Sequence, residues 1–218
     1  MSLKGIFPID QWHFSTQSAL EVLSETDYKE LISKQPKQKY KKGEIIYKEG
    51  VMPSGLFFIH QGKIKKYKVD QYGREHVLYI VNREELVGYH AILAEERYTD
   101  SASALQSSVI SFIPQEAFIA VLHKSALFAR HLLKLMSQEI TVFSNKLSIF
   151  GQRTAVERLA IALIILREKF KIDTPDDAAI TIDISRNDLA AIAGIAKENV
   201  IRLLKESRFA IFIPSTGR

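Results

Sequence analysis

Cysteine is missing from this chain of 218 residues. Its absence excludes disulfide bonds, thiolate zinc sites, cysteine nucleophiles and cysteine-ligated iron–sulfur clusters. Long apolar runs are missing too: the longest, residues 159–166, is too short to span a bilayer, and the initial MSLKGIFPID lacks the apolar core of a signal peptide. We therefore expect a cytoplasmic protein without membrane contact.

Metal-binding spacings of histidine are also missing. The chain has six histidines but no H-x-H or H-x-x-x-H pattern, which disfavours a metal-dependent β-barrel enzyme of the cupin type. We expect no metal site, no evident cofactor and no enzymatic activity. Haem ligation by an isolated histidine stays open as an alternative, and its candidates are His60, His76, His90, His123 and His131.

The composition is that of an ordinary globular protein, with 46% hydrophobic and 25% charged residues. The length suits two modest domains, and the formal net charge of +5 permits a polyanionic partner. Much of the positive charge lies between Lys34 and Lys68, where ten lysines accompany only Glu44 and Glu49. We interpret these lysines as the solvated face of a sheet.

Short apolar runs punctuated by turn residues extend from Lys39 to Pro114 and predict strands. Glycines at positions 43, 50, 55, 62, 73 and 88 mark the expected turns, and their spacing is typical of an antiparallel roll or barrel. Ile64, Tyr67 and Val69 are separated by lysines, which indicates a sheet with one face in water. The run ELVGYHAIL, residues 85–93, is interpreted as one of the strands.

From Ser125 to Gly151 the apolar spacing becomes helical. One set of residues recurs at alternating intervals of three and four, the a/d seam of a coiled coil: Leu133, Met136, Ile140, Phe143, Leu147 and Phe150. We predict that this seam joins two copies of the chain. A second stripe is expected to pack on the chain's own β-domain: Leu132, Leu135, Val142 and Ile149. The alternative is a single buried helix with two apolar sides.

A further helix is expected from about Thr154 to Lys169, after a hinge at residues 151–153. The stretch SRNDLAAIAGIAKENVIRLLKE, residues 185–206, then predicts a helix-turn-helix. Ser185 caps its first helix, and Gly194 supplies the left-handed residue at the turn. An unrelated helical hairpin is the alternative. The outward positions of the second helix carry side chains that suit base edges in the major groove: Lys197, Glu198, Asn199 and Arg202.

Taken together, KKGEIIYKEG, GLFFIHQGKIKKYKVDQYGREHVLYIV, VGYHAIL, VERLAIALIIL and ISRNDLAAIAGIAKENVIRLLKE resemble the Crp/Fnr family of bacterial transcription regulators. The resemblance implies an α+β fold: an N-terminal antiparallel β-roll, jelly-roll-like and similar to a cyclic-nucleotide-binding domain, a long dimerisation helix, and a C-terminal winged-helix-type helix-turn-helix domain. The implied divisions are residues 1–124 with an N-terminal helical segment, 125–151, and 152–218.

The resemblance further implies a homodimer that binds a pseudo-palindromic operator in double-stranded DNA and contacts RNA polymerase. By position, Lys197, Glu198 and Arg202 match the family's base-reading residues, whereas Ser185 and Arg186 match positions that approach backbone phosphates.

The effector site departs from the cyclic-nucleotide-binding pattern. Gly88 is present, but Tyr89 stands where a ribose-binding glutamate is expected, and Asp100 stands where a phosphate-binding arginine is expected. An aspartate repels a phosphate, so we predict that cyclic AMP is not the effector, which the sequence leaves unidentified. Arg97 could bind phosphate under a shifted alignment. The other residues expected at this pocket are His90, Ser101, Ala102 and Ser144.

The C-terminus departs as well. Only SRFAIFIPSTGR follows Glu206, with one strand-like run at residues 209–213, so we expect a shortened wing and fewer phosphate contacts. The sequence therefore favours a DNA-binding regulator. The alternative is an orphan small-molecule sensor with an impaired, truncated DNA-binding domain.

Overall fold

The structure is a computed structural model, and it describes residues 12–14, 18, 20–174 and 179–206. Its centre is a β-roll of two antiparallel four-stranded sheets, with strand orders β1-β8-β3-β6 and β2-β7-β4-β5. The strands are β1 (Lys37–Tyr40), β2 (Ile45–Tyr47), β3 (Gly55–Gln61), β4 (Ile64–Val69), β5 (Glu75–Val81), β6 (Leu86–Val87), β7 (Ser101–Ala104) and β8 (Ser108–Pro114).

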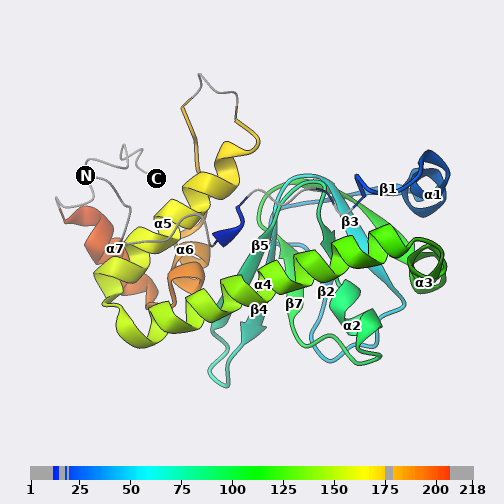
Figure 1. Cartoon of the computed structure of the whole chain (residues 1–218). Helices are drawn as coiled ribbons and strands as arrows, with labels where there is room; N and C mark the ends of the chain where they lie inside the picture. The colour runs from blue at the N-terminus through cyan, green and yellow to red at the C-terminus, as the bar shows by residue number, and fades with distance from the viewer. Residues whose placement is uncertain (1–11, 15–17, 19, 175–178, 207–218) are drawn as a thin grey trace.

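Helices surround the roll and form a separate group beyond it (Figure 1). They are α1 (Glu25–Tyr28), the π-helical turn η2 (Lys29–Ser33), α2 (Tyr89–Leu93), α3 (Gln115–Lys124), α4 (Ala126–Gln152), α5 (Ala155–Lys171), α6 (Arg186–Ala193) and α7 (Lys197–Lys205). The predicted α+β fold, with its antiparallel roll and C-terminal helices, is confirmed. None of the described helices is long and apolar enough to cross a membrane.

The long helix α4 connects the two parts of the molecule. Its 27 residues correspond to a length of about 40 Å, and Figure 1 shows it running along the roll and ending beneath α5, α6 and α7. Ser125 begins the helix by accepting a hydrogen bond from the Phe128 backbone amide. At its end Arg153 is extended, and the side chains of Thr154 and Glu157 then form a capping box that starts α5. The chain turns sharply between α4 and α5 because one helix ends and the next begins within these few residues.

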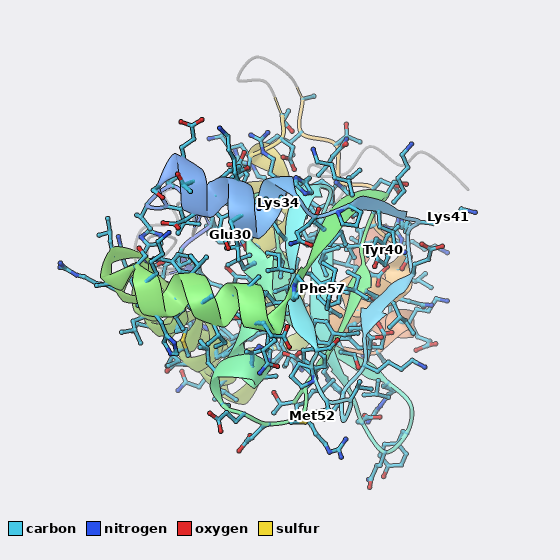
Figure 2. The ribbon with its side chains drawn as sticks, turned by 90° about the vertical axis from the view of Figure 1, so that its right-hand side faces the viewer. Glu30, Lys34, Tyr40, Lys41, Met52 and Phe57 are labelled. Carbon is cyan, nitrogen blue, oxygen red and sulfur yellow. The ribbon has the colours of Figure 1, made fainter. Side chains whose placement is uncertain are left out.

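Apolar side chains from both sheets fill the roll, which excludes water from its interior. Phe57, Ile59, Ile64 and Ile110 are among the buried residues of this cluster, and Figure 2, a view turned 90° from Figure 1, shows Phe57 within the sheet while the lysine Lys41 projects from its edge. A separate cluster joins α5, α6 and α7 to Val77 and Ile80 of β5 and to Tyr67 of β4. The C-terminal helices therefore pack directly against the second sheet.

Two expectations about the strands are wrong. Residues 89–93 form α2 rather than a strand, because Gly88 adopts the left-handed conformation (φ 90°) and turns the chain after a two-residue strand. The lysines of strand β4 are also not solvated: Lys65 and Lys66 are 7% and 4% exposed, and the preceding Lys63 is 1% exposed. A register shift between Lys66 and Tyr67 changes which side chains face water, and Val69 is 50% exposed.

Candidate functional site

The predicted effector pocket is filled by a buried polar cluster, which we name the Lys66 cluster: Lys66, Asp100, Glu139, Tyr47 and Tyr89. In the sheet, Lys66 of β4 pairs with Ala102 of β7, which brings its side chain beside Asp100. The ammonium nitrogen of Lys66 lies 2.6 Å from Glu139 Oε1 and 3.6 Å from Asp100 Oδ2. Because Glu139 belongs to α4, this contact joins the roll to the long helix.

Two tyrosines complete the hydrogen bonding of the carboxylates. The Tyr89 hydroxyl donates to Glu139 Oε2 at 3.0 Å, and the Tyr47 hydroxyl donates to Asp100 Oδ1 at 2.9 Å. Burial and the neighbouring carboxylate raise the pKa of each tyrosine well above its ordinary value. Both hydroxyls therefore stay protonated and act as donors.

Lys66 and Glu139 hold each other in their ionised forms. Burial acts to lower the pKa of Lys66, but the carboxylates of Glu139 and Asp100 outweigh it and leave the pKa above its ordinary value. Burial acts to raise the pKa of Glu139, but the Lys66 ammonium and the Tyr89 hydroxyl outweigh it and leave the pKa below its ordinary value. One ammonium between two carboxylates gives a net charge of −1, which disfavours an anionic ligand.

His90 lies at the edge of this cluster, 3.9 Å from Asp100 Oδ1 through its Nε2 atom. Burial, with the nearby Lys66 ammonium, lowers its pKa, so the ring is neutral at pH 7. Within the described part of the chain, no group of three or more side chains is arranged to hold a metal ion.

The structure brings together most of the predicted pocket residues but not all of them. Tyr89 and Asp100 belong to the cluster, and Gly88 and His90 lie next to it. Ser101 and Ala102 are buried in β7 beside it. Ser144 is exposed on α4, one turn beyond the exposed Ile140, so it does not join the cluster. The alternative phosphate ligand Arg97 is also exposed and donates to the Gly50 carbonyl.

Sequence reasoning missed Lys66, Glu139 and Tyr47. The available signal was weak: a glutamate among apolar residues on the predicted seam helix, and a lysine on a strand next to an aspartate in place of an arginine. Opposite charges at positions far apart in sequence indicate a pair only once the fold places them together.

The helix-turn-helix forms as predicted. Ser185 caps α6 by accepting a hydrogen bond from the Asp188 backbone amide at 3.0 Å, and Gly194 ends the helix with φ 63° and ψ 38°. A Cβ atom at Gly194 would lie 2.3 Å from Cε1 of Phe150, and Arg158 donates to the Gly194 carbonyl at 3.1 Å. The turn thus requires glycine both for its backbone angle and for its contact with the end of α4.

The second helix, α7, buries one face and exposes the other. Val200 and Leu203 are buried, whereas Lys197, Glu198 and Arg202 are exposed and Asn199 is half-buried. Arg202 forms an ion pair at 2.6 Å with Glu206, the residue that follows the end of the helix, and this exposed contact contributes little stability. At the start of α6, Ser185 and Arg186 are exposed as well. The residues predicted at the wing lie outside the described residues.

The predicted a/d seam of α4 separates into two groups. Leu133, Ile140 and Leu147 are 64%, 65% and 73% exposed, and we name them the α4 stripe. The other three seam residues contact the chain itself: Met136 packs against the core cluster beneath α3, Phe143 lies 5.8 Å from the Lys66 ammonium, and Phe150 packs on Gly194. The second predicted stripe faces inward, with Leu132 and Val142 buried and Leu135 and Ile149 packed on core clusters.

Comparisons with known proteins agree with this architecture. The family model described as "Cyclic nucleotide-binding domain" matches residues 37–125. The chain is 28% identical over 178 residues to the transcriptional activator protein anr of Pseudomonas aeruginosa, covering 82% of this chain and 72% of that protein. It is also 28% identical over 168 residues to the fumarate and nitrate reduction regulatory protein of Vibrio cholerae, covering 77% and 67%.

Solved structures show the same fold. The c-di-GMP responsive global regulator CLP of Xanthomonas campestris superposes with a TM-score of 0.73 at 17% identity, covering 89% of this chain and 96% of that chain. FixK2 from Bradyrhizobium japonicum superposes with a TM-score of 0.69 at 18% identity, covering 84% and 89%.

The matched residues 37–125 contain the whole β-roll, and α4 joins that roll to the helix-turn-helix of α6 and α7. Over most of its length the chain is similar to these transcription regulators, and its roll matches the cyclic nucleotide-binding domain.

Proposed function

We propose that the protein is a cytoplasmic, homodimeric, DNA-binding transcription regulator whose sensor does not respond to cyclic AMP. The observation that carries the proposal is the α6–Gly194–α7 unit, which buries its apolar face and leaves Lys197, Glu198 and Arg202 exposed. Side chains at these positions of a recognition helix reach base edges in the major groove, with arginine or lysine suited to guanine and glutamate to cytosine.

The α4 stripe supports the dimer. Three large apolar side chains spaced seven residues apart stand exposed on one helix, and burial against a second copy would remove each of them from water. A two-fold axis along α4 places Ser144 toward the partner and sets the two recognition helices about 34–36 Å apart, one turn of DNA. A pseudo-palindromic operator follows from that symmetry, and RNA polymerase is the expected further partner.

The Lys66 cluster supports the exclusion of cyclic AMP. A phosphate at Asp100 would meet a carboxylate already hydrogen-bonded to Tyr47, and a ribose hydroxyl at Tyr89 would meet a phenol already donating to Glu139. The ligand would have to displace a buried ion pair and bring a like charge into the pocket.

DNA binding is tested by selecting sites from a random duplex pool and titrating the selected operator. We expect a palindromic preference that added cyclic AMP leaves unchanged. Substituting Lys197→Ala together with Arg202→Ala should weaken operator binding by roughly 10- to 100-fold for each base-reading side chain removed, and it should relax the selected sequence. Lys134→Ala, at an exposed position on α4, is the matched control and should leave affinity unchanged.

Arg186→Ala separates phosphate contact from base reading. It should weaken all sequences alike and reduce the slope of affinity against salt concentration by about one. If the wild-type protein shows no preference over random duplex, the orphan-sensor function is the better description. If the Lys197/Arg202 double variant binds the operator with wild-type affinity, the assignment of α7 as the recognition helix is wrong.

A further inference from the structure

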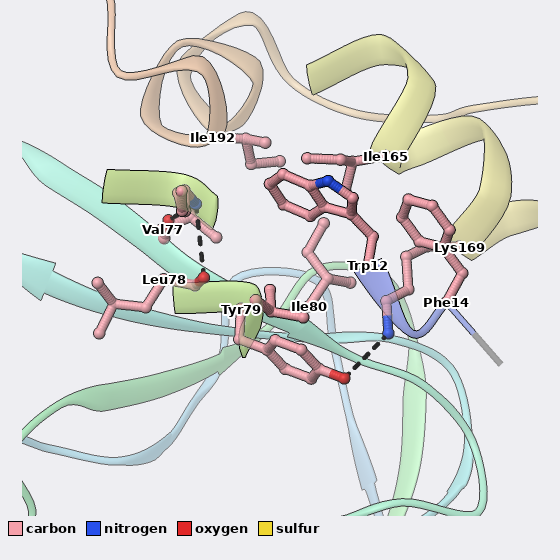
Figure 3. A pocket seen from close by; sticks show the side chains of 11 residues that line it. Trp12, Phe14, Val77, Leu78, Tyr79, Ile80, Ile165, Lys169 and Ile192 are labelled. Atoms are coloured by element: carbon pink, nitrogen blue, oxygen red, sulfur yellow. Dashed lines mark hydrogen bonds between the residues drawn. The ribbon is translucent and has the colours of Figure 1, made fainter. Parts of the chain in front are cut away.

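The single tryptophan of the chain, Trp12, lies buried at the junction of the sensor and the helix-turn-helix domain. It is 3% exposed, although it precedes α1 in the sequence. The side chains around it come from both parts of the molecule, and we name four of them the Trp12 seat: Tyr79 of β5, Val142 of α4, Ile165 of α5 and Ile192 of α6. Figure 3 shows the indole between Ile165 and Ile192, with Tyr79 below it.

Residues that follow Trp12 attach this segment to the roll. The Ser18 hydroxyl donates to the Glu84 backbone carbonyl at 2.9 Å, and Leu20 is 4% exposed within the core cluster beneath α3. Phe14 lies beside the indole, with ring centroids 6.4 Å apart and ring planes inclined by 12°. The segment is thus fixed to the sensor at Ser18 and Leu20 and inserted between the two domains at Trp12.

The backbone between the two aromatic residues is strained. His13 has a φ of 44°, in the left-handed region that residues other than glycine seldom adopt. Such conformations persist where the surrounding contacts over-determine them, and the rings of Trp12 and Phe14 provide those contacts on either side of His13. Side-chain packing rather than backbone preference therefore holds Trp12 in its seat.

Little space remains beside the indole. A cavity of about 30 Å³ adjoins the seat, which is room for roughly two water molecules. Besides apolar side chains it is lined by Lys146 of α4 and Lys169 of α5, which donate to the Leu78 carbonyl at 3.5 Å and to the Tyr79 hydroxyl at 3.3 Å. Because both lysines find acceptors within the chain, the seat offers mainly apolar surface to its occupant, and that occupant is Trp12.

We propose that Trp12 acts as an intramolecular ligand of its seat, and that occupation of the seat couples the sensor to the helix-turn-helix domain. Tyr79 and Val142 lie on the sensor and on α4, whereas Ile165 and Ile192 belong to helices beyond the turn after α4. A buried tryptophan removes roughly 150–250 Å² of surface from water, and here that surface contacts both domains at once.

Withdrawal of the indole would loosen the domain without detaching it. The apolar cluster that joins the C-terminal helices to the second sheet does not include Trp12 and remains in place. The contact that Trp12 makes with α5 and α6 would be lost, and other orientations of the two domains would become more populated. Whatever favours the occupied seat therefore favours one orientation of the helix-turn-helix domain.

Truncation of the indole tests this coupling without DNA. Trp12→Ala should increase amide hydrogen exchange in α5 and α6 by about 10-fold or more, while exchange in β3 and β8 of the roll changes little. Tyr72→Ala removes an aromatic ring that is 73% exposed on the roll, and as the matched control it should change neither. Exchange that rises equally in the roll and in α5 and α6, or that rises in neither, overturns the proposal.

Added indole separates occupation of the seat from other effects of the substitution. Removing a buried side chain leaves an apolar space that a small molecule of matching shape can enter. Indole at concentrations on the order of millimolar should return exchange in α5 and α6 of the Trp12→Ala protein toward the wild-type value, and it should leave wild-type protein unchanged. If indole has no effect on a folded Trp12→Ala protein, Trp12 does not act by filling its seat, and the proposal is wrong.

A second variant keeps the test open if Trp12→Ala does not fold, which circular dichroism checks. Trp12→Phe leaves a smaller space and should show the same pattern of exchange with a smaller increase. A folded Trp12→Phe protein with wild-type exchange in α5 and α6 contradicts the proposal.

The consequence for DNA rests on the function proposed above. In a DNA-binding dimer, a coupled domain fixes the separation of the two recognition helices, so the wild-type protein should select one half-site spacing and Trp12→Ala should accept several. A wild-type protein that selects no site contradicts the proposed function but leaves the exchange experiment intact. Unchanged spacing in a Trp12→Ala protein whose exchange has risen contradicts the coupling of the seat to DNA reading.

Discussion

At the scale of single residues, the molecule is unusual in burying lysines within its sensor domain. Lys63, Lys65 and Lys66 sit on or beside one strand, and each forms an ion pair with a carboxylate from the C-terminal half of the chain: Asp173, Asp188 and Glu139. In the segment KIKKYK, lysines alternate with apolar residues as on a strand with one face in water, so the sequence alone predicts that these lysines are exposed. Partners more than seventy residues away are visible only in the folded chain.

The Lys66 cluster predicts that Lys66→Met destabilises the protein more than Glu139→Gln does. Lys66→Met leaves Asp100 and Glu139 without their cation and should lower the free energy of unfolding by about 3–5 kcal/mol. Glu139→Gln leaves Lys66 paired with Asp100 and should cost about 1–3 kcal/mol. Urea denaturation measures both. Equal costs, or a larger cost for Glu139→Gln, would show that Asp100 does not share the lysine.

Lys146 gives a pH dependence of defined sign. Below pH 8 it is protonated in the folded and the unfolded chain, and the folded state bears the cost of a poorly solvated charge. Between about pH 8 and pH 10.5 the folded chain loses the proton first, the unfolded chain binds more protons, and stability rises. The rise is on the order of 3 kcal/mol.

The Lys146→Met variant isolates this effect from that of other titrating groups, including Lys169. The variant should unfold at higher urea concentration than wild type at about pH 7.5, and the difference should shrink as the pH approaches 10.5. A difference that is constant with pH would show that the ammonium is well solvated.

At the scale of elements, one apolar pattern in the sequence of α4 serves several contacts. The helix packs on the roll and on α3, it contacts Gly194 of the helix-turn-helix, and its exposed α4 stripe faces the proposed second subunit. The heptad spacing predicted a helix over residues 125–151, and the structure has α4 at Ala126–Gln152, because a period near 3.5 is a strong signal over almost three heptads. The pairing of this seam with a second copy stays a prediction. The spacing could not separate the α4 stripe from Met136, Phe143 and Phe150, since all six lie on adjoining rows of one helix surface. The helix-turn-helix was predictable in more detail, since a cap and a left-handed glycine mark its ends.

The α4 stripe predicts the state of association. Ile140→Asp places a charge at the centre of the proposed dimer contact and should convert the dimer to a monomer in sedimentation analysis, because a buried unpaired carboxylate is costly. Lys134→Asp changes the net charge of the chain by more than Ile140→Asp does, but Lys134 lies on another side of the same helix, so this variant should leave the dimer intact. A wild-type protein that sediments as a monomer at micromolar concentration contradicts the dimer, and with it the palindromic operator.

At the scale of the whole molecule, the C-terminal domain contacts the roll through ion pairs as well as through the apolar cluster that joins its helices to β4 and β5. Lys65 bridges Glu75 of the roll and Asp188 in the first turn of α6, and Lys42 contacts Asp183 just before that helix. The order of the domains could be predicted from the sequence, but their docking could not, because it depends on which strand face receives α5 and α6. The Asp188 carboxylate also accepts from Ser185, so the docking contact reaches the proposed phosphate-binding end of α6.

Removing the docking lysine should loosen this domain. Lys65→Met deprives Asp188 of its cation and should increase amide hydrogen exchange in α6 by roughly 10-fold or more, while exchange in the core strands of the roll changes little. Lys68→Met, on the same strand but exposed and paired with Glu49, serves as the control. Unchanged exchange in α6 would show that apolar packing alone holds the domain.

Glu139 and Ile140 are consecutive residues of α4, one turned toward the Lys66 ammonium and the other toward solvent where a second subunit would lie. A change at Glu139 that moves this turn of α4 also moves Ile140. For the proposed dimer, thermodynamic reciprocity then requires that the pairing of subunits alter the proton and ligand affinities of the buried charges by the same factor with which those charges alter pairing. Protein concentration would then be an input to the sensor.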